Sequence, residues 1–134
     1  MGTDGIPTAA RDLIVQSIDS VAQLETLLWL LAHAPRAATP AEVASDLRMD
    51  RAWVARQLTE LARRGLASES EGGYAYAPAT PELDAAAREL ARAYKERRVA
   101  VITLIFSKPP DHLRDIADAF RLGRKPPPRE TPNG

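Results

Sequence analysis

The chain has no cysteine among its 134 residues, which excludes a disulfide framework, a thiolate metal site and a cysteine nucleophile. Aromatic residues make up only 5% of it, and 18 basic and 18 acidic side chains give a formal net charge of zero. A neutral chain has no overall attraction to nucleic acid or to an anionic membrane, so binding to either requires a local patch. Because the lack of cysteine fits a reducing compartment, we expect a cytoplasmic protein.

Long apolar segments are also missing. The two strongest, 27–32 and 99–106, are far shorter than the roughly 20 residues that span a bilayer, and the N-terminus has no basic region followed by an apolar core. We therefore expect a soluble protein without a membrane partner. Its 45% apolar content predicts one domain over 12–122, between a flexible segment 1–11 and a disordered tail 123–134 that has nothing apolar to bury.

Histidine is scarce as well. His33 and His112 are the two histidines, and neither has a nearby acid and nucleophile in a recognisable catalytic arrangement. His33 ends a predicted helix, where an imidazole commonly meets the terminal carbonyls. Glycines occur singly or in a hairpin turn, so there is no loop that would cradle a phosphate. We therefore expect no enzyme activity, no cofactor and no metal.

What the chain does contain begins with a well-specified helix over 40–48. Thr39 is its predicted N-cap, Pro40 takes the first helical position, and Glu42 is spaced to close a capping box. Val43, Ala44 and Leu47 fall on one face at helical spacing. The pattern predicts a short amphipathic helix.

A second helix is predicted over 51–64, with Asp50 as its cap and Gly65 as the left-handed residue that ends it. The buried face should carry Val54, Leu58, Leu61 and Ala62. The opposite face should carry Arg51, Trp53, Arg56, Gln57, Glu60 and Arg63.

A β-hairpin follows. Residues 66–70 and 74–77 are short enough for two strands, and Glu71-Gly72-Gly73 supplies the glycines that a tight turn needs. The order helix, turn, helix, hairpin over 39–79 is that of a winged helix-turn-helix, whose second helix can enter a DNA major groove. The predicted fold is mainly α with this small β-hairpin, flanked by helices on both sides.

Residues 50–66 also resemble the recognition helix of MarR-type winged-helix transcriptional regulators. The matching core positions are Val54, Leu58, Leu61 and Leu66. The resemblance implies that Arg56 meets DNA and that Gly65 stops the helix. Trp53 stands where that family has a small hydroxyl residue facing base edges, Ala55 replaces a serine that contacts phosphate, and the wing segment 67–80 lacks the family's arginine.

Charge is distributed unevenly along the chain. Residues 36–66 hold six arginines against four acidic groups, a net of +2, whereas 1–35 is net −3 and the wing segment 67–80 is net −2. These features predict a sequence-specific regulator that binds double-stranded DNA. Its candidate contacts are Arg48, Arg51, Trp53, Arg56, Gln57, Arg63 and Arg64. Two alternatives stay open: the arginines are an ordinary solvated face, or the unit binds a protein partner through Trp53 and its acidic wing.

The flanking segments predict further helices. Residues 20–33 read as one helix, with Ser20 as its cap, and 82–107 as another of about 26 residues with Thr80 as the cap before it. A final helix up to residue 122 follows Pro109-Pro110. Surplus apolar surface on these helices predicts a homodimer through 20–33 and 82–122. The alternatives are that 20–33 is the central core helix and that the protein is a monomer.

Overall fold

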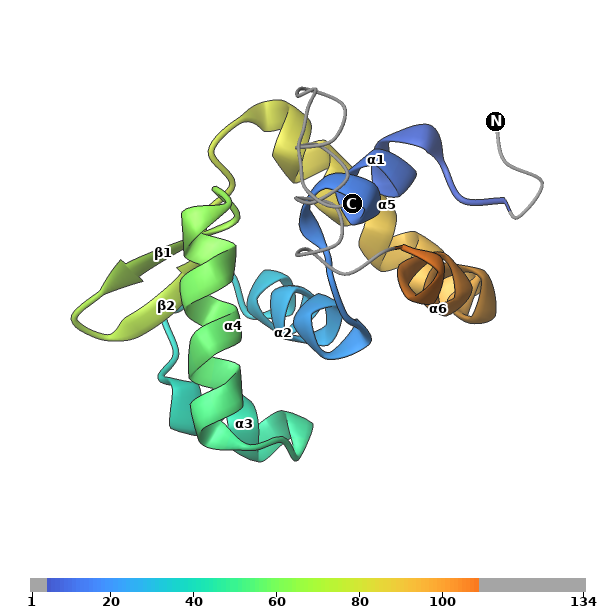
Figure 1. The fold of residues 1–134 in the computed structure, drawn as a ribbon. Coiled ribbons are helices and arrows are strands. Elements are labelled where there is room, and N and C mark those ends of the chain that lie inside the picture. Colours follow the sequence, from blue (N-terminus) through green and yellow to red (C-terminus); the bar gives the residue numbers. More distant parts are fainter. Residues whose placement is uncertain (1–4, 109–134) are drawn as a thin grey trace, which may run out of the picture.

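A computed structural model describes residues 5–108, and this part of the chain forms six helices and one two-stranded antiparallel sheet (Figure 1). The elements are α1 (Thr8–Ser17), α2 (Val21–Ala32), α3 (Pro40–Leu47), α4 (Arg51–Arg63), β1 (Ala67–Ser70), β2 (Gly73–Tyr76), α5 (Pro81–Glu96) and α6 (Arg98–Ser107). The hairpin directly follows the helices α3 and α4, an order consistent with the winged-helix arrangement.

The helices begin where short polar side chains accept the first free backbone N–H groups. The N–H of Glu42 donates to Thr39 at 3.2 Å, that of Trp53 to Asp50 at 2.9 Å, that of Gln23 to Ser20 at 3.0 Å and that of Leu83 to Thr80 at 3.1 Å. All four predicted caps are thereby confirmed. The Glu42 carboxylate, expected to complete a capping box, pairs with Arg36 at 2.7 Å.

The wing is paired to the rest of the fold as well as to itself. Its strands pair from Ala67 opposite Tyr76 to Ser70 opposite Gly73. Ala38, in the loop before α3, forms an isolated bridge to Tyr74, with N–H donors and carbonyl acceptors 2.8 Å apart in both directions. The hairpin is therefore held against the α2–α3 loop by backbone bonds.

Helix α2 lies between the winged unit and the group formed by α1, α5 and α6 (Figure 1). Leu24, Leu27 and Leu30 are fully buried and pack into one apolar core with residues of both groups. Of the two interpretations of segment 20–33, the structure shows the central core helix. Burying α2 on several sides explains why its sequence is apolar almost all the way round.

Some expectations from the sequence differ from the structure, and others concern residues that it does not describe. The single helix over 82–107 is wrong, because the backbone leaves helical geometry at Arg97 (φ −132°, ψ 49°) and α6 starts afresh. Helix α1 begins at Thr8, and Ile6 and Ala10 are buried, so the folded part includes the end of the segment 1–11 that was expected to precede the domain. The predicted helix up to residue 122 and the tail 123–134 lie outside the described residues.

Candidate nucleic-acid interface

The outer face of α4 is set by its helical periodicity. Val54, Leu58 and Leu61 are fully buried, which turns the residues half a turn away toward solvent. The exposed positions are Arg51, Ala52, Arg56, Thr59 and Arg63. Arginines therefore alternate with small side chains along this face.

Three of the candidate arginines are available for a negatively charged partner. Arg51 and Arg56 are exposed on α4, and Arg48 is exposed in the turn before it, in the left-handed conformation (φ 58°) that ends α3. Within residues 5–108 none of the three forms an ion pair. Because their charge is not neutralised there, these guanidinium groups can meet phosphate or base edges.

Arg63 is exposed but engaged. Its side chain is 69% exposed and pairs with Glu60 one turn earlier on the same helix. The hydrogen bond from Arg63 is the main reason why the pKa of Glu60 lies below its usual value. Such an exposed pair is weak, so it can open when a stronger anion approaches.

Arg64 has a structural role, because it joins α4 to the end of α1. Only 11% of its side chain is exposed; it donates to Asp19 at 2.8 Å and to Glu60 at 2.7 Å, and it also reaches the Ser17 carbonyl. Burial alone would lower the pKa of Arg64, but the two carboxylates outweigh it and raise that pKa. We therefore leave Arg64 out of the contact set proposed below.

Trp53 and Gln57 lie on the flank of α4 that faces α2, not on its outermost face. Trp53 is half-buried and packs against the core. Gln57 is also half-buried, and its Oε1 accepts a hydrogen bond from Gln23 at 3.0 Å. Both border an open hollow of about 480 Å³ between α4 and the start of α2, which Arg56 and Arg63 also line.

The outer face of α4 also includes Thr59, which was not among the residues predicted from the sequence. Thr59 lies seven residues after Ala52 and three after Arg56, and it follows from the same 3.6-residue period. Its hydroxyl lies 3.2 Å from that of Tyr74, which ties α4 to the wing. The wing itself is acidic, with Glu69 and Glu71 both exposed.

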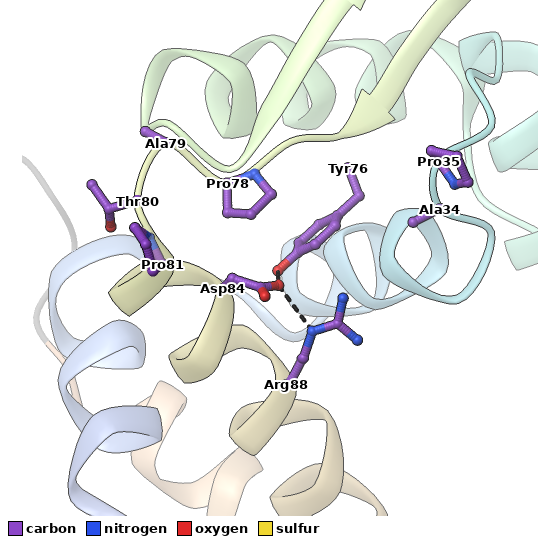
Figure 2. Close-up of a pocket in the computed structure, with 9 residues that line it drawn as sticks. All are labelled: Ala34, Pro35, Tyr76, Pro78, Ala79, Thr80, Pro81, Asp84 and Arg88. Carbon is purple, nitrogen blue, oxygen red and sulfur yellow. Dashed lines mark hydrogen bonds and ion pairs between the residues drawn. The ribbon is translucent and has the colours of Figure 1, made fainter.

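A second hollow was not predicted from the sequence. It measures about 550 Å³ and opens between the α2–α3 loop, β2 and α5 (Figure 2). Figure 2 shows the Tyr76 hydroxyl pointing at Asp84, to which it donates at 2.6 Å, while Arg88 donates to the same oxygen at 2.9 Å. The Tyr76 hydrogen bond, followed by Arg88, lowers the pKa of Asp84. The spacing of Asp84 and Arg88 on one helix was a usable signal, but Tyr76 joins them only through the fold.

Two further properties of the described part of the chain bear on its class. None of its helices combines the length and the apolar composition that crossing a membrane requires. Among residues 5–108, no three His, Cys, Asp or Glu side chains are grouped so that they could hold a metal ion. Comparison of the chain with protein-family models, with curated proteins and with solved structures found no match.

Proposed function

We propose that the protein is a sequence-specific DNA-binding transcriptional regulator that inserts α4 into the major groove. The observation that carries this proposal is the outer face of α4, where exposed Arg51 and Arg56 stand among the short side chains of Ala52 and Thr59. Short side chains let a helix come close to base edges, and arginine pairs with guanine in a bidentate manner. The resemblance of residues 50–66 to MarR-type regulators supports the same conclusion.

Phosphate contacts would come from the periphery of this face. Arg48 lies at the α3–α4 turn and Arg63 at the far end of α4, so the two flank the central Arg56. Arginines at both ends of a groove-bound helix are placed to meet the sugar–phosphate backbone.

We further propose that the protein acts as a homodimer through α6, because α2 is interior. Val99 and Phe106 are 77% and 76% exposed, and together with half-buried Ile102 they form an apolar stripe at helical spacing along α6. Covering this stripe with a second copy would remove it from water. A two-fold dimer would present two α4 helices to half-sites about 34 Å apart.

The test is binding to duplex DNA at several salt concentrations. If the dimer makes four to six phosphate contacts, the slope of log affinity against log salt should be about −4 to −5. Arg56→Ala should weaken binding by about tenfold or more, whereas Arg92→Ala, which removes an exposed arginine on α5, should leave it unchanged. A flat salt dependence, or equal binding by the two variants, would count against the proposal.

One observation favours a different function, a winged-helix module that binds another protein. The exposed Glu69 and Glu71 give the wing a charge that DNA repels and a basic protein surface attracts. Selection from random duplex DNA at physiological salt separates the two functions. Enrichment of a common sequence supports the regulator, and failure to enrich any sequence supports the module.

A further inference from the structure

Gln23 is a buried polar side chain close to the proposed DNA-binding face. It lies in the first turn of α2 and is 2% exposed. A buried amide must have its oxygen and its nitrogen hydrogen-bonded, because an unsatisfied polar group in the interior costs free energy. Gln23 meets this requirement with one partner on each side. Its Oε1 accepts from the backbone N–H of Asp19 at 2.9 Å, and its Nε2 donates to Gln57 Oε1 at 3.0 Å.

The orientation of both amides follows from that one backbone group. A peptide N–H only donates, so the Gln23 atom facing Asp19 must be the oxygen. The atom that faces Gln57 is then the Gln23 NH₂ group, which also only donates. Gln57 must therefore present its own oxygen to Gln23. The Gln57 NH₂ group is left over, and within residues 5–108 no hydrogen bond occupies it.

The backbone N–H of Asp19, where this chain of hydrogen bonds begins, is held in place by its surroundings. The carboxylate of Asp19 accepts from Arg64 at 2.8 Å and lies 3.6 Å from the Lys108 ammonium group. Both cations come from distant helix ends, those of α4 and α6, and both also donate to carbonyls at the end of α1. The Asp19 N–H is thus fixed between helices.

We propose that Gln57 is a donor-only contact to DNA and that Gln23 is the residue that positions it, an inference that rests on the proposed function. Gln57 borders the hollow of about 480 Å³ beside Arg56, where a groove-bound α4 would meet the duplex. An unconstrained glutamine reads adenine with its oxygen and its nitrogen together. Gln57 has only its NH₂ group to offer, so it selects hydrogen-bond acceptors: a phosphate oxygen, guanine O6 or N7, adenine N7, or thymine O4, without the second contact to adenine N6 that a free glutamine makes.

The first experiment removes or inverts the donor. Gln57→Met deletes it, and Gln57→Glu keeps the oxygen that faces Gln23 but turns a second oxygen toward the DNA. We expect Gln57→Met to weaken binding to the selected duplex by about tenfold and Gln57→Glu to weaken it more, because an acceptor then faces an acceptor. Gln16→Met and Gln16→Glu make the same changes at an exposed position of α1 and should bind as the parent chain does.

The second experiment tests the positioning role. Gln23→Met keeps the shape of the buried side chain but releases the Gln57 amide, which can then turn and use both of its atoms. We expect a smaller loss of affinity together with a gain of adenine at the contacted position in a repeated selection, a change that general destabilisation would not produce. The side-chain amide signals of Gln57 and Gln23, followed by nitrogen-15 NMR as duplex is added to the parent chain, report the same contact without any variant. Only the Gln57 signals should shift strongly.

The outcomes separate this inference from the proposed function. A loss in Gln57→Met that is equal for all sequences identifies a phosphate as the acceptor, and a loss confined to one base position identifies a base edge; both support the inference. Parental affinity in Gln57→Met, with Arg56→Ala still impaired, overturns the inference and leaves the regulator intact. Absence of duplex binding by the parent chain overturns both.

Discussion

At Gly73 the backbone of the wing runs so close to Ala38 that there is no room for a side chain. The φ of Gly73 is +116°, and a Cβ built there would lie 2.1 Å from the Ala38 carbonyl oxygen. The neighbouring Gly72 is different, because a Cβ there would meet only the Ala37 methyl at an ordinary 3.5 Å. The two glycines of the turn therefore have unequal roles.

Gly73→Ala should lower the free energy of unfolding by about 3 kcal/mol or more, because the methyl group requires both a strained φ and displacement of the Ala38 bridge. Gly72→Ala is the matched control and should change it by no more than about 0.5 kcal/mol. Urea unfolding followed by circular dichroism measures both values. Equal stability of the two variants would show that the hairpin does not depend on the close approach at residue 73.

Residues with local partners were predictable from the sequence, and residues with distant partners were not. Thr39, Asp50, Ser20 and Thr80 each cap a helix through a group three residues away, so spacing alone revealed them. The Gln23–Gln57 pair and the partnership of Arg64 with Asp19 join positions 34 and 45 residues apart. No local pattern encodes such pairs, so the sequence did not reveal that Arg64 is bound to Asp19.

At the scale of elements, the break between α5 and α6 shows tertiary packing overriding a helical pattern. The segment around Arg97 contains no glycine or proline, and local signals favour one continuous helix. The break redirects α6 so that Val101 and Ile105 become buried and α6 contacts α1. Next to it, the Arg98 guanidinium lies 4.5 Å from the centre of the Tyr94 ring and 3.4 Å from Glu25.

Tyr94, at the same junction, predicts that the free energy of unfolding falls at alkaline pH. Burial, followed by the hydrogen bond that the Tyr94 hydroxyl donates to Glu25 at 2.7 Å, raises the pKa of Tyr94 to about 12. An unfolded tyrosine has a pKa of about 10, so the native state holds this proton more tightly. The stabilisation is complete below pH 10 and is lost as the pH rises from 10 to about 12.

Tyr94→Phe should cost about 1 kcal/mol at pH 8 and should make the decline in stability between pH 10 and 12 shallower. The measurement is the urea unfolding free energy of both chains at several pH values. A residual decline is expected in the variant, because burial and its bond to Asp84 raise the pKa of Tyr76 as well. Identical pH profiles of the two chains would contradict the assignment to Tyr94.

At the scale of the whole molecule, the net charge is zero because regions of opposite charge, which lie apart on the surface, cancel. The basic residues Arg48, Arg51 and Arg56 are exposed around α4, and the acidic Glu69 and Glu71 on the wing. Helix α6, which carries the apolar stripe, lies on the opposite side of the fold from the hairpin (Figure 1). A second copy seated on that stripe would leave α4 uncovered in both subunits.

Phe106→Glu tests the dimer. Val99 and Phe106 are the most exposed large apolar side chains of the described residues, so a carboxylate between two facing copies of α6 would be desolvated without a partner. We expect the parent chain to sediment as a dimer at about 10 μM, in the affinity range common for specific association, and Phe106→Glu to sediment as a monomer. Ala85→Glu adds the same charge at an exposed position of α5 and should remain dimeric.

Duplex binding connects this result to the proposed function. A monomer contacts one half-site and releases about half of the counterions, so Phe106→Glu should show a salt slope about half that of the parent chain. Ala85→Glu should keep the full slope if the dimer rather than the added charge is responsible. A parent chain that sediments as a monomer would overturn the dimer. The proposal that the protein binds DNA would still stand, with one α4 per duplex, since the exposed arginines of α4 belong to a single chain.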